Sequence, residues 1–315
     1  MRNLLGNIFR FLFFIVITYG ICILIWGNLM PETLKPNLKY KVGGYGYSFT
    51  KLAEAKKFEN VDVLFLGSSQ AYRSFDPRIF KRNKLNIFNL GTTNQTPIQT
   101  RTLIEKYLDI LNPKIIIFQV SPMTFTFDGV ESGLDIISND KIDYYSIKMA
   151  LKLNNIKVYN TLAFGLINGL FFDKSTHKEH LIKGEDKYIS GGFVEKKIKF
   201  YKKQAFKSDE WKFDERQLLA LDEILKILKA KEVPTILVNT PVTSAYYNSY
   251  SNNTEFDSIM ESKAEYLNFN KILQLDDSLN FYDPYHLNQN GVNELNPLLI
   301  PVINKKINSL NYLDK

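Results

Sequence analysis

The stretch Val61-Asp-Val-Leu-Phe-Leu-Gly-Ser-Ser-Gln70 decides the fold of this chain. The six mostly apolar residues at 61–66 predict a buried strand, which ends abruptly at Gly67 and is followed by residues that suit a helix. The hydroxyl groups of Ser68 and Ser69 therefore fall at the carboxyl end of a strand. In an open α/β sheet, this edge is where ligands and catalytic groups are found.

The Gly-Ser-Ser turn allows two interpretations. A serine at this position is a candidate nucleophile, because the following helix N-terminus and the backbone N–H groups can stabilise an oxyanion. Taken alone, the turn is explained more simply as a strand end with a serine helix cap. The choice between the two depends on residues near the other end of the chain.

Apolar runs of the same kind recur along the chain and alternate with helix signals. The predicted strands cover residues 61–66, 86–90, 114–120 and 233–239. Asp76-Pro77 and Thr96-Pro97 are helix starts, the second helix runs to about Leu111, and residues 214–231 form an amphipathic helix. Continuous apolar strands that alternate with helices predict a central parallel sheet covered on both faces, in a flavodoxin-like three-layer α/β sandwich.

The remaining segments are assigned more coarsely. Residues 31–59 are interpreted as a linker with a short entry helix at 51–59, and residues 60–315 as one α/β domain. Within the domain, residues 123–207 are interpreted as an insertion or cap over the sheet edge. The last third is expected to hold a short strand around 272–275 and a final helix after Gly291 that Pro301 interrupts.

The N-terminus carries an uncharged run at residues 11–30, which is long enough to cross a bilayer as a helix. Arg2 and Arg10 precede this run, and Trp26 stands where an interfacial aromatic residue is expected. A cleavable signal peptide is the alternative, but the run is long and no small-x-small site follows it. We therefore predict a single-pass signal anchor at residues 1–30 in the inner (cytoplasmic) membrane, with the domain outside the cytoplasm, in the periplasm.

Composition excludes several classes of function. The net charge of +7 comes from lysines scattered along the chain, which indicates a solvated surface and no nucleic-acid partner. The single cysteine, Cys22, excludes an internal disulfide, a CxxC pair and a cysteine zinc site. His177 and His180 form an H-x-x-H pattern in a lysine-rich stretch, and we interpret them as solvated loop residues because a metal site needs three or four fixed ligands. No metal and no cofactor are predicted.

Candidate catalytic residues lie near the end of the chain, in Phe281-Tyr-Asp-Pro-Tyr-His-Leu-Asn288. Asp283 can bind one imidazole nitrogen of His286, which fixes the tautomer and leaves the other nitrogen as a general base. An isolated D-x-x-H is more simply a turn histidine. Combined with a serine at a strand end in an α/β order, the two halves support one Ser-His-Asp triad, with Ser69 as its serine.

These motifs resemble blocks one, two and five of the SGNH (GDSL-type) hydrolases, over roughly residues 60–295. The matching motifs are Gly67-Ser-Ser69, Asn89-Leu-Gly91 and Asp283-x-x-His286-Leu-Asn288. The resemblance implies that Ser69 is the nucleophile, that His286 is the base and that Asp283 orients it, while Ser68 replaces the aspartate of Gly-Asp-Ser. It also implies that the Ser69 and Gly91 N–H groups donate to the oxyanion.

One block of that family is missing. The family's Gly-x-Asn-Asp block supplies an oxyanion asparagine, whereas the third strand here ends in Gln119-Val-Ser-Pro122. Losing one oxyanion donor costs on the order of 100-fold or more in rate. Asn94 and Asn239 each follow a strand end, so Asn94 is a candidate oxyanion donor and Asn239 a candidate substrate-binding residue, although either could merely cap a turn.

A membrane-anchored domain with Gly-Ser-Ser resembles the subset of this family that is linked to extracytoplasmic O-acylation, including alginate and peptidoglycan acetylation and teichoic-acid D-alanylation. That resemblance implies acylated cell-surface glycans as substrates and a multi-spanning membrane O-acyltransferase as a partner. The leading hypothesis is a serine esterase or O-acyltransferase acting on acetyl-type esters of extracytoplasmic polysaccharide. The alternative is a degenerate domain that binds glycan, or the acyltransferase, without turnover.

A nucleotide-binding role is disfavoured because Gly67-Ser-Ser69 lacks the glycines and lysine of a phosphate loop.

Overall fold

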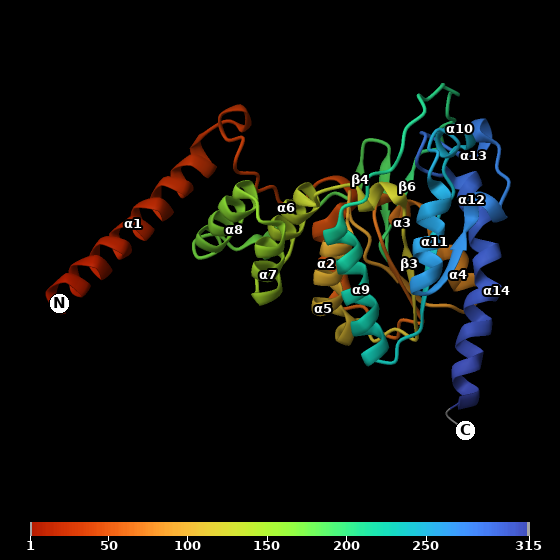
Figure 1. Ribbon diagram of the computed structural model, residues 1–315, viewed down its shortest axis with the longest axis horizontal. Coiled ribbons are helices and arrows are strands. Elements are labelled where there is room, and N and C mark those ends of the chain that lie inside the picture. The colour runs from red at the N-terminus through yellow and green to blue at the C-terminus, as the bar shows by residue number, and fades with distance from the viewer. Residues whose placement is uncertain (1, 314–315) are drawn as a thin grey trace.

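The computed structural model describes the backbone of residues 2–313 and the side chains of residues 3–309. Five parallel strands form a central sheet in the order β2-β1-β3-β7-β8, between two layers of helices (Figure 1). The strands are β1 (Val63–Leu66), β2 (Ile87–Asn89), β3 (Ile115–Gln119), β7 (Thr235–Asn239) and β8 (Glu265–Asn268). This is the flavodoxin-like order, so the predicted three-layer sandwich is confirmed.

Strand β1 lies in the interior of the sheet, which explains the unbroken apolar sequence at residues 63–66. It pairs with β2 on one side and β3 on the other, and all four of its residues are buried. Leu64 and Leu66 point into the core on one face of the sheet, whereas Val63 and Phe65 point into the core on the other. Because both faces are covered, every residue of the strand has to be apolar.

Helices cover both faces of the sheet. The layer packed on Leu64 and Leu66 contains α2 (Ser48–Ala55), α5 (Pro97–Leu111), α9 (Glu215–Ala230) and α11 (Asn253–Lys263). The opposite layer contains α3 (Ser69–Ser74), α4 (Pro77–Arg82), α12 (Phe269–Ile272) and α14 (Gln289–Leu313). The predicted start signals are confirmed: Asp76 caps α4, and Thr96 forms a capping box with Gln99 at the start of α5.

Residues 123–207 form helices and a small second sheet. The helices are α6 (Val130–Asn139), α7 (Tyr144–Leu153) and α8 (Ile156–Asn168), and the antiparallel strands are β4 (Ile182–Lys183), β5 (Asp186–Ile189) and β6 (Phe193–Lys196). The turn between β5 and β6 lies against the free edge of β2, where the Asn89 N–H donates to the Gly191 carbonyl (2.9 Å). This contact protects the edge of the main sheet.

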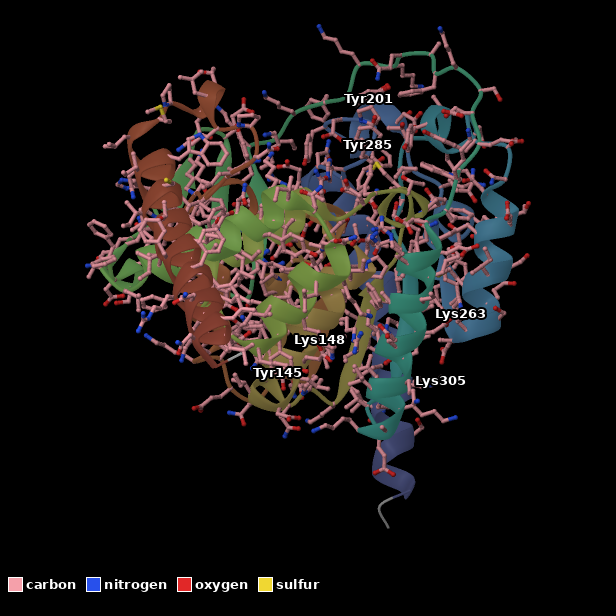
Figure 2. The ribbon with its side chains drawn as sticks, turned by 60° about the vertical axis from the view of Figure 1, so that its left-hand side comes forward. Tyr145, Lys148, Tyr201, Lys263, Tyr285 and Lys305 are labelled. Atoms are coloured by element: carbon pink, nitrogen blue, oxygen red, sulfur yellow. The ribbon has the colours of Figure 1, made fainter. Side chains whose placement is uncertain are left out.

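After β6 the chain runs without regular structure to α9 and arches above the carboxyl ends of the main strands (Figure 1). The segment is fastened near its start by the Tyr201 N–H, which donates to the Phe281 carbonyl (2.9 Å), and further on by the Asp209 N–H, which donates to the Ser249 carbonyl (2.9 Å). Figure 2 shows Tyr201 and Tyr285 together at this end of the molecule. The segment therefore lies over the edge where the strands end.

Three local predictions were wrong. The last strand is β8 at 265–268, and residues 269–272 form α12, because an edge strand is only partly buried and gives a weak apolar signal. The entry helix α2 begins and ends several residues earlier than expected. Helix α14 starts before Gly291 and continues through Pro297 and Pro301, because its buried leucines pack under the sheet and tertiary packing outweighs the cost of proline.

Helix α1 (Arg2–Leu29) extends away from the domain and contacts α8 (Figure 1). Tyr19 Oη donates to Asn160 Oδ1 (2.6 Å), and the Phe164 ring packs on Gly27. Within residues 3–29, an 18-residue window reaches a mean hydropathy of 2.5, and only 6% of that window is buried. Within the described chain, α1 is the one helix that is both long enough and apolar enough to cross a membrane. A signal sequence at the N-terminus has the same length and apolar composition.

Asn296 fastens α14 to the junction of α3 and α4. Its side chain is fully buried, with Nδ2 donating to the Ser74 carbonyl (2.6 Å) and Oδ1 accepting from the Asp76 N–H (3.0 Å). We expect Asn296→Ala to lower the free energy of unfolding by about 3 kcal/mol, because two buried backbone groups lose their partners. Asn293→Ala, one turn earlier and exposed, should change it by less than about 0.5 kcal/mol. Urea unfolding followed by tryptophan fluorescence tests this, and equal effects of the two substitutions would contradict it.

Candidate active site

The turn after β1 places Ser69 at the carboxyl edge of the sheet. Gly67 has φ +137°, and a Cβ atom there would lie 2.6 Å from Gln119 Oε1, so only glycine fits. Ser68 caps α3 by accepting a hydrogen bond from the Gln70 N–H (3.3 Å). Ser69 is the first residue of α3 and is 9% exposed. The chain therefore turns sharply enough to direct the Ser69 hydroxyl away from the strand.

The structure brings Ser69, His286 and Asp283 together across 217 residues of chain. His286 Nε2 lies 2.8 Å from Ser69 Oγ, and His286 Nδ1 lies 2.9 Å from Asp283 Oδ2. Asp283 Oδ1 accepts hydrogen bonds from the backbone N–H groups of Tyr285 (2.8 Å) and His286 (2.9 Å). These distances are those of a hydrogen-bonded serine, histidine and carboxylate in a row.

Electrostatics favour an ionised Asp283. Burial acts to raise its pKa, but the hydrogen bond and the charge of His286 and the two backbone N–H groups outweigh burial, and the pKa is lowered. A carboxylate on Nδ1 holds the proton of the neutral imidazole at Nδ1, so the Nε2 lone pair faces the Ser69 hydroxyl. The Tyr282 ring stacks on His286 with a centroid distance of 5.5 Å and an interplanar angle of 3°. The imidazole is therefore fixed in both orientation and tautomer.

A buried amide network joins the serine turn to the histidine loop. Gln119 Oε1 accepts from the Ser68 N–H (3.1 Å) and Oγ (3.2 Å), and Gln119 Nε2 donates to Gln70 Oε1 (3.0 Å). Gln70 Nε2 then donates to the Tyr285 carbonyl (3.2 Å). The histidine loop is also tied to the segment after β7, where the Thr243 N–H donates to the Pro284 carbonyl (3.0 Å). Gln119 thus has a structural role at the position of the missing asparagine.

The predicted oxyanion donors are only partly available. The Ser69 N–H has no hydrogen-bond partner among residues 2–313. The Gly91 N–H donates to Asn89 Oδ1 (2.9 Å), while Asn89 Nδ2 donates to the Ala71 carbonyl (2.9 Å). The Gly91 N–H is therefore already paired in this structure, because the side chain two residues earlier folds back over the turn, and its role as an oxyanion donor stays a prediction.

The two predicted asparagines lie in different surroundings. Asn94 is exposed, has φ +51° and lines a cavity of about 320 Å³ together with Tyr45 and Asp135. Asn239 is buried at the end of β7 and lines a narrow crevice with Trp211. In the described part of the chain neither side chain hydrogen-bonds to the triad, and their roles in oxyanion and substrate binding stay predictions.

An aromatic wall borders the histidine loop and was missed in the sequence. Its centre is Tyr246, whose ring contacts those of Phe206, Trp211, Tyr250 and Tyr285. Tyr285 meets Tyr246 edge to face at 4.6 Å, and Trp211 stacks on Tyr250 at 3.5 Å. The rings come from three segments that are far apart in the sequence, so their contact could not be predicted from any one of them. The cluster of tyrosines at 246–250 was the one sequence feature that hinted at an aromatic surface.

Lys51 is a second site feature that the sequence did not reveal. Its ammonium group is fully buried, donates to the Gly91 carbonyl and lies 4.4 Å from the centroid of the Tyr72 ring. Burial lowers its pKa to about 7. A lysine on an amphipathic helix is expected in solvent, yet here it joins the entry helix to the loop that follows β2.

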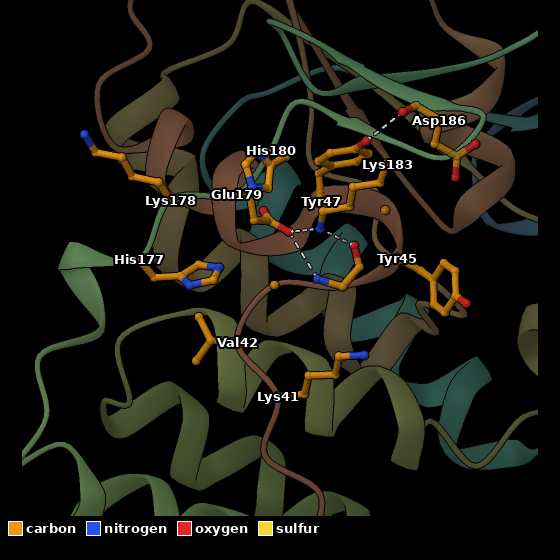
Figure 3. A pocket seen from close by; sticks show the side chains of 13 residues that line it. Lys41, Val42, Tyr45, Tyr47, His177, Lys178, Glu179, His180, Lys183 and Asp186 are labelled. Carbon is orange, nitrogen blue, oxygen red and sulfur yellow. Dashed lines mark hydrogen bonds and ion pairs between the residues drawn. The ribbon is translucent and has the colours of Figure 1, made fainter.

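His177 and His180 line a cavity of about 320 Å³ beside the N-terminal segment (Figure 3). Between them, the Glu179 carboxylate accepts from the N–H groups of Gly44 (3.1 Å) and Thr50 (2.9 Å) and also pairs with Lys183. That carboxylate is committed to holding the entry segment in place. Among the described residues, no group of three or more His, Cys, Asp or Glu is arranged to hold a metal ion.

Comparison with known proteins gives likenesses at the level of structure alone. No family model and no curated protein matches the chain. A GDSL-like lipase from Bacteroides thetaiotaomicron VPI-5482 is 11% identical, with 83% of this chain and 99% of that chain covered and a TM-score of 0.42. A proposed acylhydrolase from Bacteroides fragilis NCTC 9343 is 13% identical, with coverages of 90% and 98% and a TM-score of 0.39. A proposed platelet activating factor from Streptococcus pneumonia is 11% identical, with coverages of 81% and 93% and a TM-score of 0.39. Likenesses this distant assign neither a family nor an activity.

The buried Lys51 makes stability depend on pH. Between its lowered pKa of about 7 and its ordinary value of 10.5, the unfolded chain holds a proton that the folded chain lacks, so the free energy of unfolding rises with pH. We expect Lys51→Met to reduce this slope by up to about 1.4 kcal/mol per pH unit. The exposed Lys57→Met should leave the slope of the wild type unchanged. Urea unfolding at several pH values from 7 to 10 measures the slopes, and an unaltered slope in Lys51→Met would refute the assignment.

Proposed function

We propose that this protein is a membrane-anchored serine esterase or O-acyltransferase of the SGNH type. The observation that carries the proposal is the contact of 2.8 Å between Ser69 Oγ and His286 Nε2, with Asp283 on the other imidazole nitrogen. A buried serine, a histidine in a fixed tautomer and an ionised carboxylate form the constellation that activates a hydroxyl for acyl transfer.

The chemistry follows from these positions. His286 Nε2 takes the proton as Ser69 Oγ attacks the ester carbonyl, and the imidazolium returns a proton to the departing alcohol. This leaves an acyl group on Ser69. In the second half, His286 takes a proton from water or from a sugar hydroxyl, whose oxygen then receives the acyl group, and Ser69 is regenerated. The Ser69 N–H, which has no hydrogen-bond partner among residues 2–313, is the donor that we propose for the oxyanion in both halves.

We further propose that the acyl group belongs to an extracytoplasmic polysaccharide, in an acetyl-type ester. The support is the aromatic wall beside the histidine loop, where the Tyr285 ring meets both His286 (6.3 Å) and the buried Tyr246 (4.6 Å) edge to face. Aromatic rings with a polar tip provide rigid contact area for ligands that are apolar on one side and hydroxylated on the other. A multi-spanning O-acyltransferase in the same membrane is the partner that we propose.

The proposed location is the inner membrane, with α1 as an uncleaved anchor and the domain in the periplasm. The support is the fitted contact between α1 and α8: a Cβ atom at Gly27 would lie 2.2 Å from the Phe164 ring, and Tyr19 hydrogen-bonds to Asn160. A signal peptide that is removed has no need of such a fit. The contact therefore favours an anchor that stays with the protein.

A second candidate function is glycan or partner binding without turnover. The observation that favours it is the shortage of oxyanion donors, since the Gly91 N–H is bound to Asn89 and Gln119 is bound to Ser68 and Gln70. Of the two predicted backbone donors, the Ser69 N–H alone has no hydrogen-bond partner among residues 2–313. The two candidates differ in whether the serine reacts.

Ser69 should be the reactive serine. We expect Ser69→Ala to abolish labelling by a fluorophosphonate probe and to lower acetyl-ester hydrolysis by about 10⁴-fold or more. Ser68→Ala should reduce both far less, because Ser68 caps α3 and binds Gln119 but does not contact His286. Probe labelling on gels and release of acetate measure the two outcomes. Labelling that survives in Ser69→Ala and disappears in Ser68→Ala would reverse the assignment.

The triad should also behave as a unit. Adding His286→Ala to Ser69→Ala should cost little further activity, and Asp283→Asn should be severe but milder than loss of the serine. A folded wild-type protein that neither reacts with the probe nor turns over an acyl ester, with or without its membrane partner, would support the binding function instead.

The anchor has its own test. Alkaline phosphatase fused after the last residue should be active in cells. Green fluorescent protein fused at the same position should be dark, because it would be exported with the domain. Both results follow if α1 crosses the membrane once and the domain lies in the periplasm. The opposite pattern would place the domain in the cytoplasm.

A further inference from the structure

The end of α8 carries large apolar side chains that no other part of the described chain covers. Leu166 is 45% exposed, Leu170 80%, Phe171 68% and Phe172 63%. We call these four residues the apolar tip. Single exposed apolar residues are common on soluble surfaces. Four large ones within the seven residues 166–172 are unusual and mark a surface that meets an apolar partner.

The apolar tip lies beside α1. Within its span, Ile167 packs on Gly20, where a Cβ atom would lie 3.2 Å from Ile167 Cδ1. Just before it, Phe164 packs on Gly27. At 1.5 Å of rise per residue, Gly20 is about 13 Å along the axis from the helix end at Leu29. Figure 1 shows α8 projecting from the domain toward α1. If α1 spans the membrane, the turn that follows Ile167 is level with the hydrocarbon rather than the water.

The backbone of this turn satisfies its own donors. The Gly169 N–H donates to the Gly165 carbonyl (3.0 Å), and the Leu170 N–H donates to the Ile167 carbonyl (3.1 Å). The N–H groups of Phe171 (3.1 Å) and Phe172 (2.9 Å) both donate to the Asn168 carbonyl. Unpaired backbone donors are the main obstacle to placing a loop in lipid. The turn at the end of α8 has no unpaired N–H among these four residues, which removes part of the cost of entering an apolar medium.

The polar residues after the turn form a boundary. Asp173 caps the short helical turn that follows by accepting from the Ser175 N–H (2.8 Å). Lys174 Nζ donates to the carbonyls of Ser138 (3.0 Å) and Asp140, which brings the chain back onto α6 and its C-terminal end. The apolar tip is thus a short projection with a fixed polar base.

We propose that the apolar tip inserts into the periplasmic half of the lipid bilayer beside α1, as a second membrane contact. This inference rests on the membrane anchoring that is part of the proposed function. Lipid is the favoured partner because the four exposed side chains lie on the last turn of α8 and the turn that follows it, beside the apolar helix α1. Two contacts, α1 and the apolar tip, fix how the domain is oriented above the membrane and therefore where the edge that holds Ser69 stands.

Cysteine accessibility tests this in full-length protein, purified and placed in nanodiscs that hold single copies. In a Cys22→Ser background, Phe171→Cys should react with a charged, membrane-impermeant maleimide more than about tenfold more slowly than Tyr45→Cys, because a thiolate does not form in hydrocarbon. Tyr45 is 82% exposed on the domain and is the matched aromatic control. Near-UV circular dichroism checks that both variants keep the wild-type fold.

The native Cys22 separates the failure of this inference from the failure of the anchor. Cys22 is exposed on α1, so in the wild type it should be protected in nanodiscs if α1 spans the bilayer. Protection of Cys22 with fast labelling of Phe171→Cys would overturn the inference and leave the anchor standing. Fast labelling of both would overturn both. Fast labelling of Phe171→Cys in nanodiscs, with protection in native membranes, would show that a partner protein covers the apolar tip and would overturn lipid insertion.

Discussion

The arrangement of the candidate site depends on the carboxamide of Gln119. A buried amide has to satisfy both its oxygen and its nitrogen, so it fixes the groups that it touches. Its oxygen takes both donors of Ser68, and its nitrogen binds Gln70, which in turn holds the carbonyl of Tyr285. Ser68 and Gln70 flank the candidate nucleophile, and Tyr285 precedes the candidate base. One side chain at the end of β3 therefore sets the positions of both reacting groups, and the same commitment explains why this position does not supply an oxyanion donor.

A buried ion pair and a buried lysine amine join the outer parts of the fold to the serine turn. Arg73, at the end of α3, forms a bidentate ion pair with Asp186 of β5 at 2.8 and 2.9 Å, which ties the small antiparallel sheet to the helix that starts with Ser69. On the other side, Lys51 of α2 binds the Gly91 carbonyl. Burying a charge is costly unless it is hydrogen-bonded, so each pair favours one docked arrangement of its segment. The entry helix and the insertion are thus part of the scaffold of the site, although neither contributes a member of the triad.

Much of the fold could be predicted because its strands lie between two covered faces. Strand β1 and the others beside it have to be continuously apolar, and a parallel sheet gathers their carboxyl ends at one edge, so a serine after β1 had a defined place. Strand β8 escaped detection because an edge strand is half exposed and has a mixed composition. Pro301 was misleading because packing outweighs local preference in α14. The state of the Gly91 N–H could not be predicted either, since it depends on the rotamer of Asn89, which no sequence pattern encodes.

The position of the serine bears on the choice between hydrolysis and transfer. An acyl group on Ser69 goes to whichever hydroxyl reaches it, and water is excluded only by what covers the site. Ser69 is 9% exposed, and the segment after β6 arches over the same edge, where its Phe206 ring meets Tyr246 of the aromatic wall at 5.3 Å. A sugar seated against that wall would fill the space that water otherwise occupies and bring its own hydroxyl beside His286. Under the proposed function, the occupancy of the wall by an acceptor, rather than any change in the triad, would decide between transfer and hydrolysis.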